Sequence, residues 1–241
     1  MTGEAVLKIE KLSFAYEKTN VLKDITFEGN LGEILVIAGP NGSGKTTLIK
    51  LMFDLLNRKN GEILVKNESS CNIAAKNQMF YLSSENILPA FLSGDEYVRM
   101  MCRLYDVTVD EKLYERLIQY YAMEHRIQTL IENYSHGMVK KIQLITAFLL
   151  QRDITVVDET LNGIDIEAKE ASKILLRKLA EKGKLVMICT HDLELAEQIG
   201  DRAVLLYKGM MKSILDMRKE KVSLTEVFKQ LVGFRESDYE I

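Results

Sequence analysis

The chain has 241 residues, 47% of them hydrophobic, a composition typical of a globular protein with one large domain or a core and a subdomain. The net charge of −3 gives no support for nucleic-acid binding, and no apolar run approaches the roughly 18–20 residues that cross a bilayer. Three dispersed cysteines and an N-terminus without an apolar signal core lead us to expect a cytosolic protein with reduced thiols.

The first part of the chain is predicted to form β-strands. Leu7 and Ile9 alternate with polar residues, and the same period of two recurs up to residue 28. Apolar stretches at 33–38, 61–65 and 79–82 are expected to form further strands. A helix is expected at residues 47–53, after the first of them.

The middle of the chain has a different pattern. Apolar residues in 86–133 follow helical spacing, which predicts an all-helical insertion between two halves of an α/β core, and a further helix is expected from about 137 to 151. Apolar runs suited to buried parallel strands then follow at 154–157, 185–189 and 203–206, and a last helix at 225–232. We therefore predict an α/β core at 1–85 and 147–215, a helical subdomain at 86–146 and a helical tail at 216–241.

The string GPNGSGKTT at residues 39–47 fits the phosphate-loop pattern G-x-x-x-x-G-K-[ST]. Its glycines allow a tight turn that brings several backbone N–H groups to one anion. Lys45 supplies a cation for the β- and γ-phosphates, and the Thr46 hydroxyl can ligate Mg²⁺. The predicted nucleotide-binding residues of this loop are Gly39, Pro40, Asn41, Gly42, Ser43, Gly44, Lys45, Thr46 and Thr47.

Further polar residues follow two of the predicted parallel strands. Asp158 and Glu159 end the run at 154–157, where one carboxylate can hold Mg²⁺ and the next can polarise a water that attacks the γ-phosphate. His191 follows the strand at 185–189, and its position alone suits a γ-phosphate contact and a structural role equally. Ser135 precedes the helix after residue 137, either as an N-cap or as part of a phosphate-binding helix start.

Together these motifs resemble the nucleotide-binding subunit of the ATP-binding cassette (ABC) family over nearly the whole chain, which implies an α/β phosphate-loop fold. GPNGSGKTT is similar to the Walker A motif and ITVVDE, at 154–159, to Walker B. NYSHGM, at 133–138, lies where the LSGGQ signature belongs, and NGID, at 162–165, matches the D-loop. The resemblance implies a phosphate-loop nucleoside triphosphatase core with a mainly parallel sheet, an N-terminal antiparallel β part and an all-helical insertion.

The resemblance implies a role for each motif residue. Asp158 would hold the metal with Thr46, Glu159 would be the catalytic base and His191 the switch histidine. The signature residues Ser135, His136 and Gly137 would face the ATP of a partner subunit. The D-loop string ends in Asp165. Tyr16 would stack on adenine, although packing against its apolar neighbours also explains it.

The sequence departs from the family pattern at several positions. His136 replaces a glycine and Met138 a glutamine of the signature, and Thr160 stands where proline usually follows Walker B. The Q-loop glutamine aligns with Ser84, beside Glu85, so either residue is a candidate for the metal site. The loss of that glutamine affects the expected turnover rate and coupling to a membrane partner, but not ATP binding.

The function implied is that of an ATP-hydrolysing subunit of a transporter, with ATP and Mg²⁺ as cofactors. Its partners would be a second ATPase subunit, paired head to tail, and separately encoded permease subunits, which would hold the chain at the cytoplasmic face of the membrane; no nucleic-acid partner is expected. The pattern looks most like exporters of peptides, drugs or lipids. The alternatives are a non-transport ABC ATPase and a slowly hydrolysing nucleotide-dependent switch. Residues 83–92 would meet the membrane partner, or merely pack the insertion onto the core.

Overall fold

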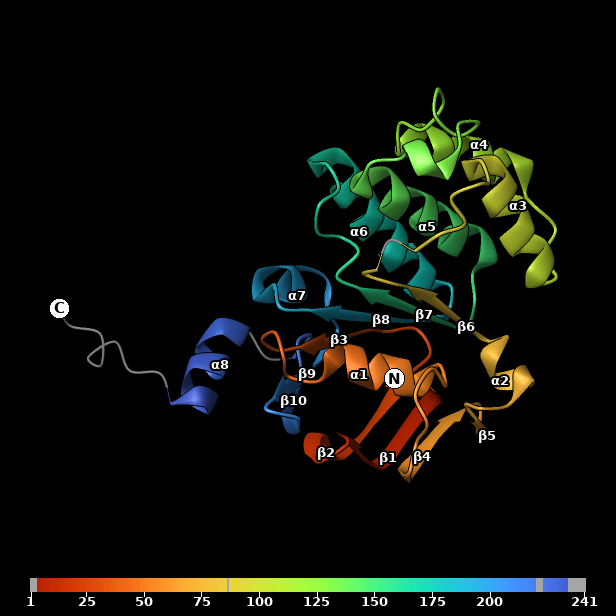
Figure 1. The fold of residues 1–241 in the computed structure, drawn as a ribbon. Helices are drawn as coiled ribbons and strands as arrows, with labels where there is room; N and C mark the ends of the chain where they lie inside the picture. Colours follow the sequence, from red (N-terminus) through yellow and green to blue (C-terminus); the bar gives the residue numbers. More distant parts are fainter. Residues whose placement is uncertain (1–3, 86, 220–222, 234–241) are drawn as a thin grey trace.

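The computed structural model describes residues 4–85, 87–219 and 223–233. Within these residues, a six-stranded sheet lies at the centre of the molecule (Figure 1). Its strands are β3 (Ile34–Ala38), β6 (Met79–Leu82), β7 (Ile154–Asp158), β8 (Leu185–Thr190), β9 (Arg202–Tyr207) and β10 (Met210–Asp216). Their order in space is β10-β9-β3-β8-β7-β6.

Neighbouring strands of this sheet run parallel except for β9 and β10. Strands β3, β7 and β8 are buried along their whole length, and each is accordingly a mainly apolar run in the sequence. Parallel strands end at the same edge of a sheet, so the residues that follow β3, β7 and β8 gather there. The predicted, mainly parallel sheet is confirmed.

The two faces of the six-stranded sheet bury two different apolar clusters. Along β3, Ile34 and Val36 belong to the cluster shared with the helical part, while Leu35 and Ile37 belong to the opposite one. This alternation follows from the period of two in a strand. Helix α1 (Lys45–Met52) packs into the second cluster, between the two sheets of the molecule (Figure 1).

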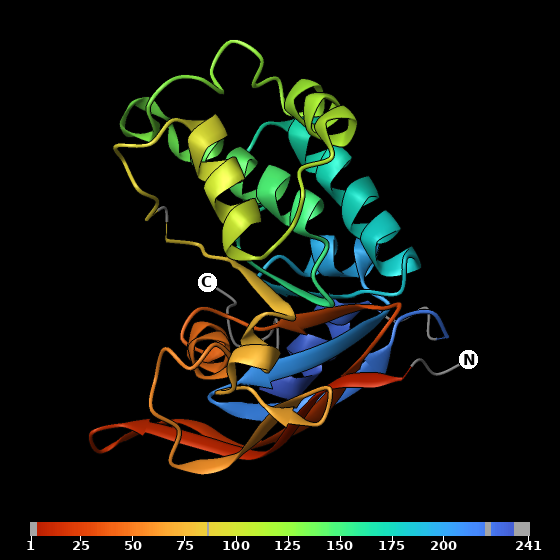
Figure 2. The same ribbon diagram turned by 90° about the vertical axis from the view of Figure 1, so that its right-hand side faces the viewer.

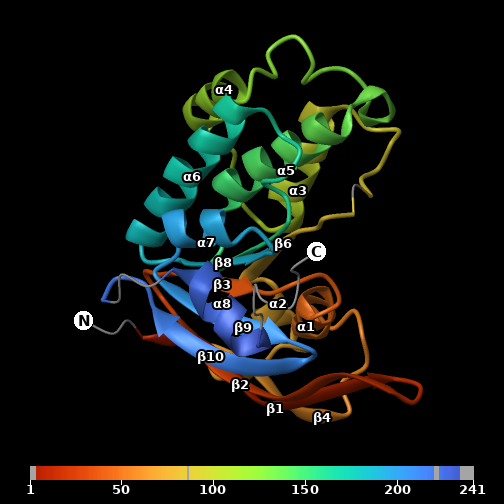
Figure 3. The same cartoon turned by 90° about the vertical axis from the view of Figure 1, so that its left-hand side faces the viewer.

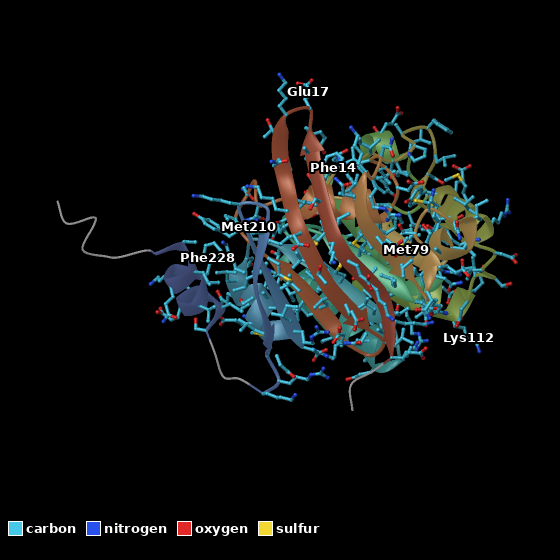
Figure 4. All side chains as sticks on the ribbon, turned by 90° about the horizontal axis from the view of Figure 1, so that it is seen from below. Phe14, Glu17, Met79, Lys112, Met210 and Phe228 are labelled. Atoms are coloured by element: carbon cyan, nitrogen blue, oxygen red, sulfur yellow. The ribbon has the colours of Figure 1, made fainter. Side chains whose placement is uncertain are left out.

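The second sheet is antiparallel and comes from the N-terminal part of the chain, as predicted. Its strands are β1 (Ala5–Tyr16), β2 (Thr19–Asn30), β4 (Asn60–Val65) and β5 (Glu68–Ser69). Leu7, Ile9 and Leu12 are fully buried against the core, and the turn after β1, at Glu17, lies at the far tip of the hairpin (Figure 4). A short helix, α2 (Ile73–Lys76), leads to β6.

A group of helices covers the other face of the six-stranded sheet (Figures 1 and 2). Its elements are α3 (Gly94–Leu104), α4 (Glu111–Tyr120), the short 3-10 helix η1 (Ile131–Asn133), α5 (His136–Leu150) and α6 (Ile166–Glu181). Helix α5 lies at the centre and contacts α3, α4 and α6. Ser93 begins α3 with a capping box, because its hydroxyl accepts from the Glu96 N–H while the Glu96 carboxylate accepts from the Ser93 N–H. The predicted fold class is therefore confirmed.

The C-terminal part of the described chain returns to the sheet edge. Helix α7 (Leu193–Ile199) precedes β9, and helix α8 (Leu224–Val232) lies beside β9 and β10 (Figure 3). The Glu197 carboxylate accepts from the backbone N–H of Leu224 at 2.5 Å, which fixes the start of α8 to α7. Residues 220–222 and 234–241 of the predicted tail lie outside the described residues. None of the helices in the described ranges combines the length and apolar character needed to cross a bilayer.

Candidate nucleotide-binding site

The phosphate loop joins β3 to α1 at the carboxyl edge of the six-stranded sheet. Gly44 has φ +104°, a conformation open mainly to glycine, and α1 starts at the next residue. A Cβ on Gly39 would lie 2.2 Å from the carbonyl oxygen of Leu206, so only glycine fits between the loop and β9. These two constraints give the loop its tight turn at the N-terminus of a helix, where backbone N–H groups can bind an anion.

Two polar side chains inside the loop are poised for a phosphate. The Lys45 ammonium donates to the carbonyls of Gly39, at 2.7 Å, and Pro40, at 3.2 Å, and is almost fully buried. The buried Ser43 hydroxyl has no hydrogen-bond partner among the described residues. Because a buried polar group without a partner is costly, this orphaned hydroxyl fits a bound phosphate oxygen. Thr46 is exposed beside the loop, whereas Thr47 is buried in α1.

Asp158 ends β7 at the same edge of the sheet and is fully buried. Its Oδ2 accepts hydrogen bonds from the Tyr81 hydroxyl, at 3.1 Å, and the Ser84 hydroxyl, at 3.2 Å. Burial raises the pKa of the Asp158 carboxyl above its usual range. Its Oδ1 is buried and has no hydrogen-bond partner among the described residues.

A carboxylate oxygen and a hydroxyl are donors that suit Mg²⁺, which is commonly held by one or two protein oxygens, waters and substrate phosphates. The orphaned Oδ1 of Asp158 and the exposed Thr46 hydroxyl match this donor set. Of the two Q-loop candidates, Ser84 contacts Asp158, while Glu85 pairs with Lys50 at 3.0 Å. Within the described chain, no group of three or more His, Cys, Asp or Glu side chains forms an all-protein metal cluster.

Glu159 and His191 come together beyond the ends of β7 and β8. Glu159 Oε1 accepts from the His191 backbone N–H at 3.0 Å and lies 2.8 Å from the ring Nδ1. Its Oε2 accepts from the Asn162 amide at 2.6 Å. The backbone of Glu159 is left-handed, with φ +54°, which is uncommon for a residue with a side chain and recurs at functional sites. The structure thus joins two predicted catalytic residues into one hydrogen-bonded group.

The predicted signature and D-loop lie beside each other in the helical part. The Ser135 hydroxyl caps α5 by accepting from the Met138 N–H at 3.3 Å, and a Cβ on Gly137 would lie 3.1 Å from the Gly163 carbonyl oxygen. His136 is the first residue of α5. Asp165 caps α6 and pairs with Lys141 of α5 at 2.5 Å, and the hydrogen bond from Lys141 lowers the pKa of Asp165.

Tyr16, the predicted adenine contact, ends β1 and is 45% exposed. Its ring meets the Phe14 ring edge-on, with centroids 4.9 Å apart. Exposure leaves one side of the ring open for stacking, and the contact with Phe14 also accounts for the residue as packing. Its role in binding adenine stays a prediction.

Three further residues of this region were not predicted from the sequence. Tyr81 holds Asp158, Asn162 holds Glu159, and the Lys140 ammonium donates to the Asn162 backbone carbonyl. The sequence places Asn162 in the D-loop string NGID, and its spacing of three from Glu159 allows a tight turn to bring the two side chains together. Tyr81 and Lys140 reach the site through tertiary contacts that no local pattern reveals.

A glycine-rich anion loop and an acidic strand end on a mainly parallel sheet define the class of phosphate-loop nucleoside triphosphatases. Residues 22–162 match the family model described as ABC transporter. The uncharacterised ABC transporter ATP-binding protein YthP of Bacillus subtilis is 30% identical over 213 residues, 88% of this chain and 86% of that protein. A solved ATP-binding subunit of an ABC transporter superposes with a TM-score of 0.87 and 28% identity, over 94% of this chain and 99% of the other. The chain therefore belongs to the ABC transporter family. It is an ATP-binding subunit, and the ATP-binding subunits of this family are ATPases.

Relatives of this chain differ in the direction of transport that their names give. The SkfA peptide export ATP-binding protein SkfE of Bacillus subtilis is 25% identical over 86% of this chain and 87% of its own length. A putative ribose/galactose/methyl galactoside import ATP-binding protein of Halalkalibacterium halodurans is 26% identical over 96% of this chain, which spans only 46% of that protein. The chain also spans 48% of a putative ABC transporter ATP-binding protein of Clostridium tetani. Export and cargo therefore remain predictions.

Proposed function

We propose that this subunit binds Mg²⁺ and ATP at the phosphate loop and hydrolyses the ATP with Glu159 as general base. The observation that carries the proposal is the register of three strands: Ala38, at the end of β3, pairs with Thr190 of β8, and Asp158 of β7 pairs with Cys189. The loop after β3, the acidic pair after β7 and the histidine after β8 are therefore at one edge of the sheet. This arrangement fits the in-line attack of a water on a γ-phosphate.

Each residue of the site has a separate task in this proposal. Lys45 and the loop N–H groups bind the phosphates, and the Asp158 carboxylate and Thr46 hydroxyl hold the metal. Mg²⁺, when bound, neutralises phosphate charge. Glu159 orients the attacking water and takes its proton, and His191 turns toward the γ-phosphate. Ser135, His136 and Gly137 would close on the ATP of a second subunit, together with the D-loop that ends at Asp165.

Replacing Glu159 with glutamine tests this proposal. Glutamine keeps the shape of the side chain but cannot accept the proton of the water, so hydrolysis should fall by roughly 10²–10⁴-fold while ATP still binds. Calorimetry with Mg²⁺ and ATP, and phosphate release by the purified chain, measure the two effects. Glu62→Gln, at an exposed position on β4, is the control and should behave as wild type. A Glu159→Gln variant that hydrolyses ATP normally would reject Glu159 as the base.

The transport role extends the proposal to the membrane. Separately encoded permease subunits would hold two copies of the chain, or one copy and a related subunit, at the cytoplasmic face of the membrane, and the ATP cycle would drive transport. The altered signature at His136 and Met138 supports export of a peptide, drug or lipid, whereas the relatives named for peptide export and for sugar import are about equally similar to this chain. Vesicles containing the assembled transporter would show ATP-dependent movement of the cargo away from the ATPase side under export, and toward that side under import.

A slowly hydrolysing nucleotide switch is the second candidate function. The observation in its favour is the Ser84 hydroxyl, which contacts Asp158 where the family pattern has a longer glutamine. A serine reaches less far into the site, so the attacking water would have one contact fewer. ATP binding that is tight and long-lived in the wild-type chain, without measurable phosphate release, would favour the switch over the transporter motor.

A further inference from the structure

The Glu159 carboxylate is held by donors from two sides. The backbone N–H and ring nitrogen of His191 face Oε1, at 3.0 and 2.8 Å, and the amide of Asn162 donates to Oε2 at 2.6 Å. A carboxylate has about four acceptor sites, so these contacts leave room for one more donor. A water is the donor that the chemistry of a general base requires.

The two sets of donors differ in what they do when ATP is bound. His191 is the residue proposed to turn toward the γ-phosphate, which would take its ring away from Glu159. Asn162 is the first residue of the D-loop string, and within its own subunit its side chain points back at Glu159 while its N–H donates to the Glu159 carbonyl at 3.1 Å. Asn162 is thus the donor that stays on the carboxylate while His191 moves.

Lys140 holds Asn162 in place from α5, the helix that begins within the signature. Its ammonium donates to the Asn162 backbone carbonyl and lies close to Gly163. Burial lowers the pKa of Lys140, and the charge of Glu159 opposes that change. The next lysine, Lys141, pairs with Asp165 at 2.5 Å, so α5 holds the turn at both ends.

We propose that Asn162 is a positioning residue for the catalytic carboxylate, and that Lys140 transmits the position of the signature helix to it. The inference rests on the proposed role of Glu159 as the base. A base works only when it is held in the productive geometry, and small misplacements lower turnover by up to about 10²-fold. Loss of the Asn162 amide should therefore lower kcat and leave ATP affinity unchanged.

The alternative is that Asn162 only shapes the turn after Walker B. Aspartate distinguishes the two roles, because it has the same shape as asparagine and also suits turns, but cannot donate to Glu159 and repels it. A structural role predicts that Asn162→Asp is close to wild type and that Asn162→Ala is worse. A positioning role predicts the reverse order, with the aspartate variant the slower of the two.

The experiment compares kcat, KM and ATP affinity of the full-length chain and its variants, with melting temperature as a check on folding. Asn162→Ala should lose on the order of 10-fold in kcat with ATP affinity within about twofold of wild type, and Asn162→Asp should lose more. Asn72→Ala removes a similar amide-to-carboxylate contact, at 3.0 Å to Glu68, on an exposed surface and should leave kcat unchanged. Wild-type kcat in a folded Asn162→Asp variant overturns the proposal.

Lys140 and the Glu159→Gln background complete the test. Lys140→Met should lower kcat with unchanged ATP affinity, and Lys140→Arg should restore part of it, because arginine can still donate to the Asn162 carbonyl. If Asn162 acts through the carboxylate, adding Asn162→Ala to Glu159→Gln should cost nothing further. Normal hydrolysis by Glu159→Gln alone would reject the proposed function, whereas an inactive Glu159→Gln with normal Asn162 variants would reject only this inference.

Discussion

At the scale of single residues, the chemistry of the phosphate loop is local, because the groups that meet the phosphates are neighbours in the chain. Glycines at fixed offsets impose a turn, and the lysine and threonine follow it at the start of a helix, so a short string contains the whole arrangement. The groups that hold Asp158 and Glu159 could not be identified in this way. Tyr81 is 77 residues from Asp158 along the chain, and Lys140 is 22 residues from Asn162, so only the fold brings each pair together.

Replacing Lys45 tests the assignment of the phosphate loop. Its ammonium is the main side-chain cation of the loop, so Lys45→Ala should weaken ATP binding and abolish turnover, because phosphate charge is then poorly compensated. Calorimetry and phosphate release measure both effects. Lys173→Ala, which removes a lysine from an ion pair with Glu170 on the surface of α6, is the control. Wild-type affinity and activity in Lys45→Ala would contradict the assignment of the loop.

At the scale of elements, strands and long helices were predicted where periodicity is strong. The run at 203–206 corresponds to β9 and the helix at 225–232 to α8, each shifted by one residue at its start. The short strand β5 and helix α2 were not predicted, because so few residues give no period. Helix α5 is continuous from His136 to Leu150, so the proposed boundary between subdomain and core, after residue 146, lies within a single helix.

The sequence pattern could not decide between two roles for the segment that connects β6 to α3. Its apolar residues were expected either to meet a membrane partner or to pack the insertion onto the core. Leu88 and Leu92 pack against the core cluster, whereas Ile87 and Phe91 are exposed, at 79% and 77%. Asn86 lies outside the described residues. The buried pair therefore packs the insertion onto the core. We propose that the exposed pair, Ile87 and Phe91, contacts the permease.

Phe91→Glu tests this contact. A charge on an exposed apolar residue should leave the melting temperature and ATP binding unchanged, while recovery of the chain with membranes that contain its permease subunits falls. Ile73→Glu places the same charge at an equally exposed residue of α2 and is the matched control. Unchanged membrane recovery in a folded Phe91→Glu variant would rule out this surface, and loss of folding would show that Phe91 is needed for packing.

At the scale of the whole molecule, each chain would contribute complementary halves to two sites. The phosphate loop, Asp158 and Glu159 lie at the edge of the sheet, while Ser135 and Gly137 begin the central helix of the helical part. In the proposed head-to-tail pair, the signature of one subunit closes the ATP site of the other. ATP would then hold the two chains together until Glu159 promotes its hydrolysis.

The most direct test of this account is the mass in solution of the Glu159→Gln variant in the presence of Mg²⁺ and ATP. With hydrolysis blocked, ATP should stay between the subunits, and light scattering after size-exclusion chromatography should give twice the chain mass of 27.5 kDa. The same variant without nucleotide should give the mass of one chain, and Ser135→Arg, which obstructs the signature, should prevent pairing with ATP. A Glu159→Gln variant that binds ATP fully and still has the mass of one chain would contradict the account.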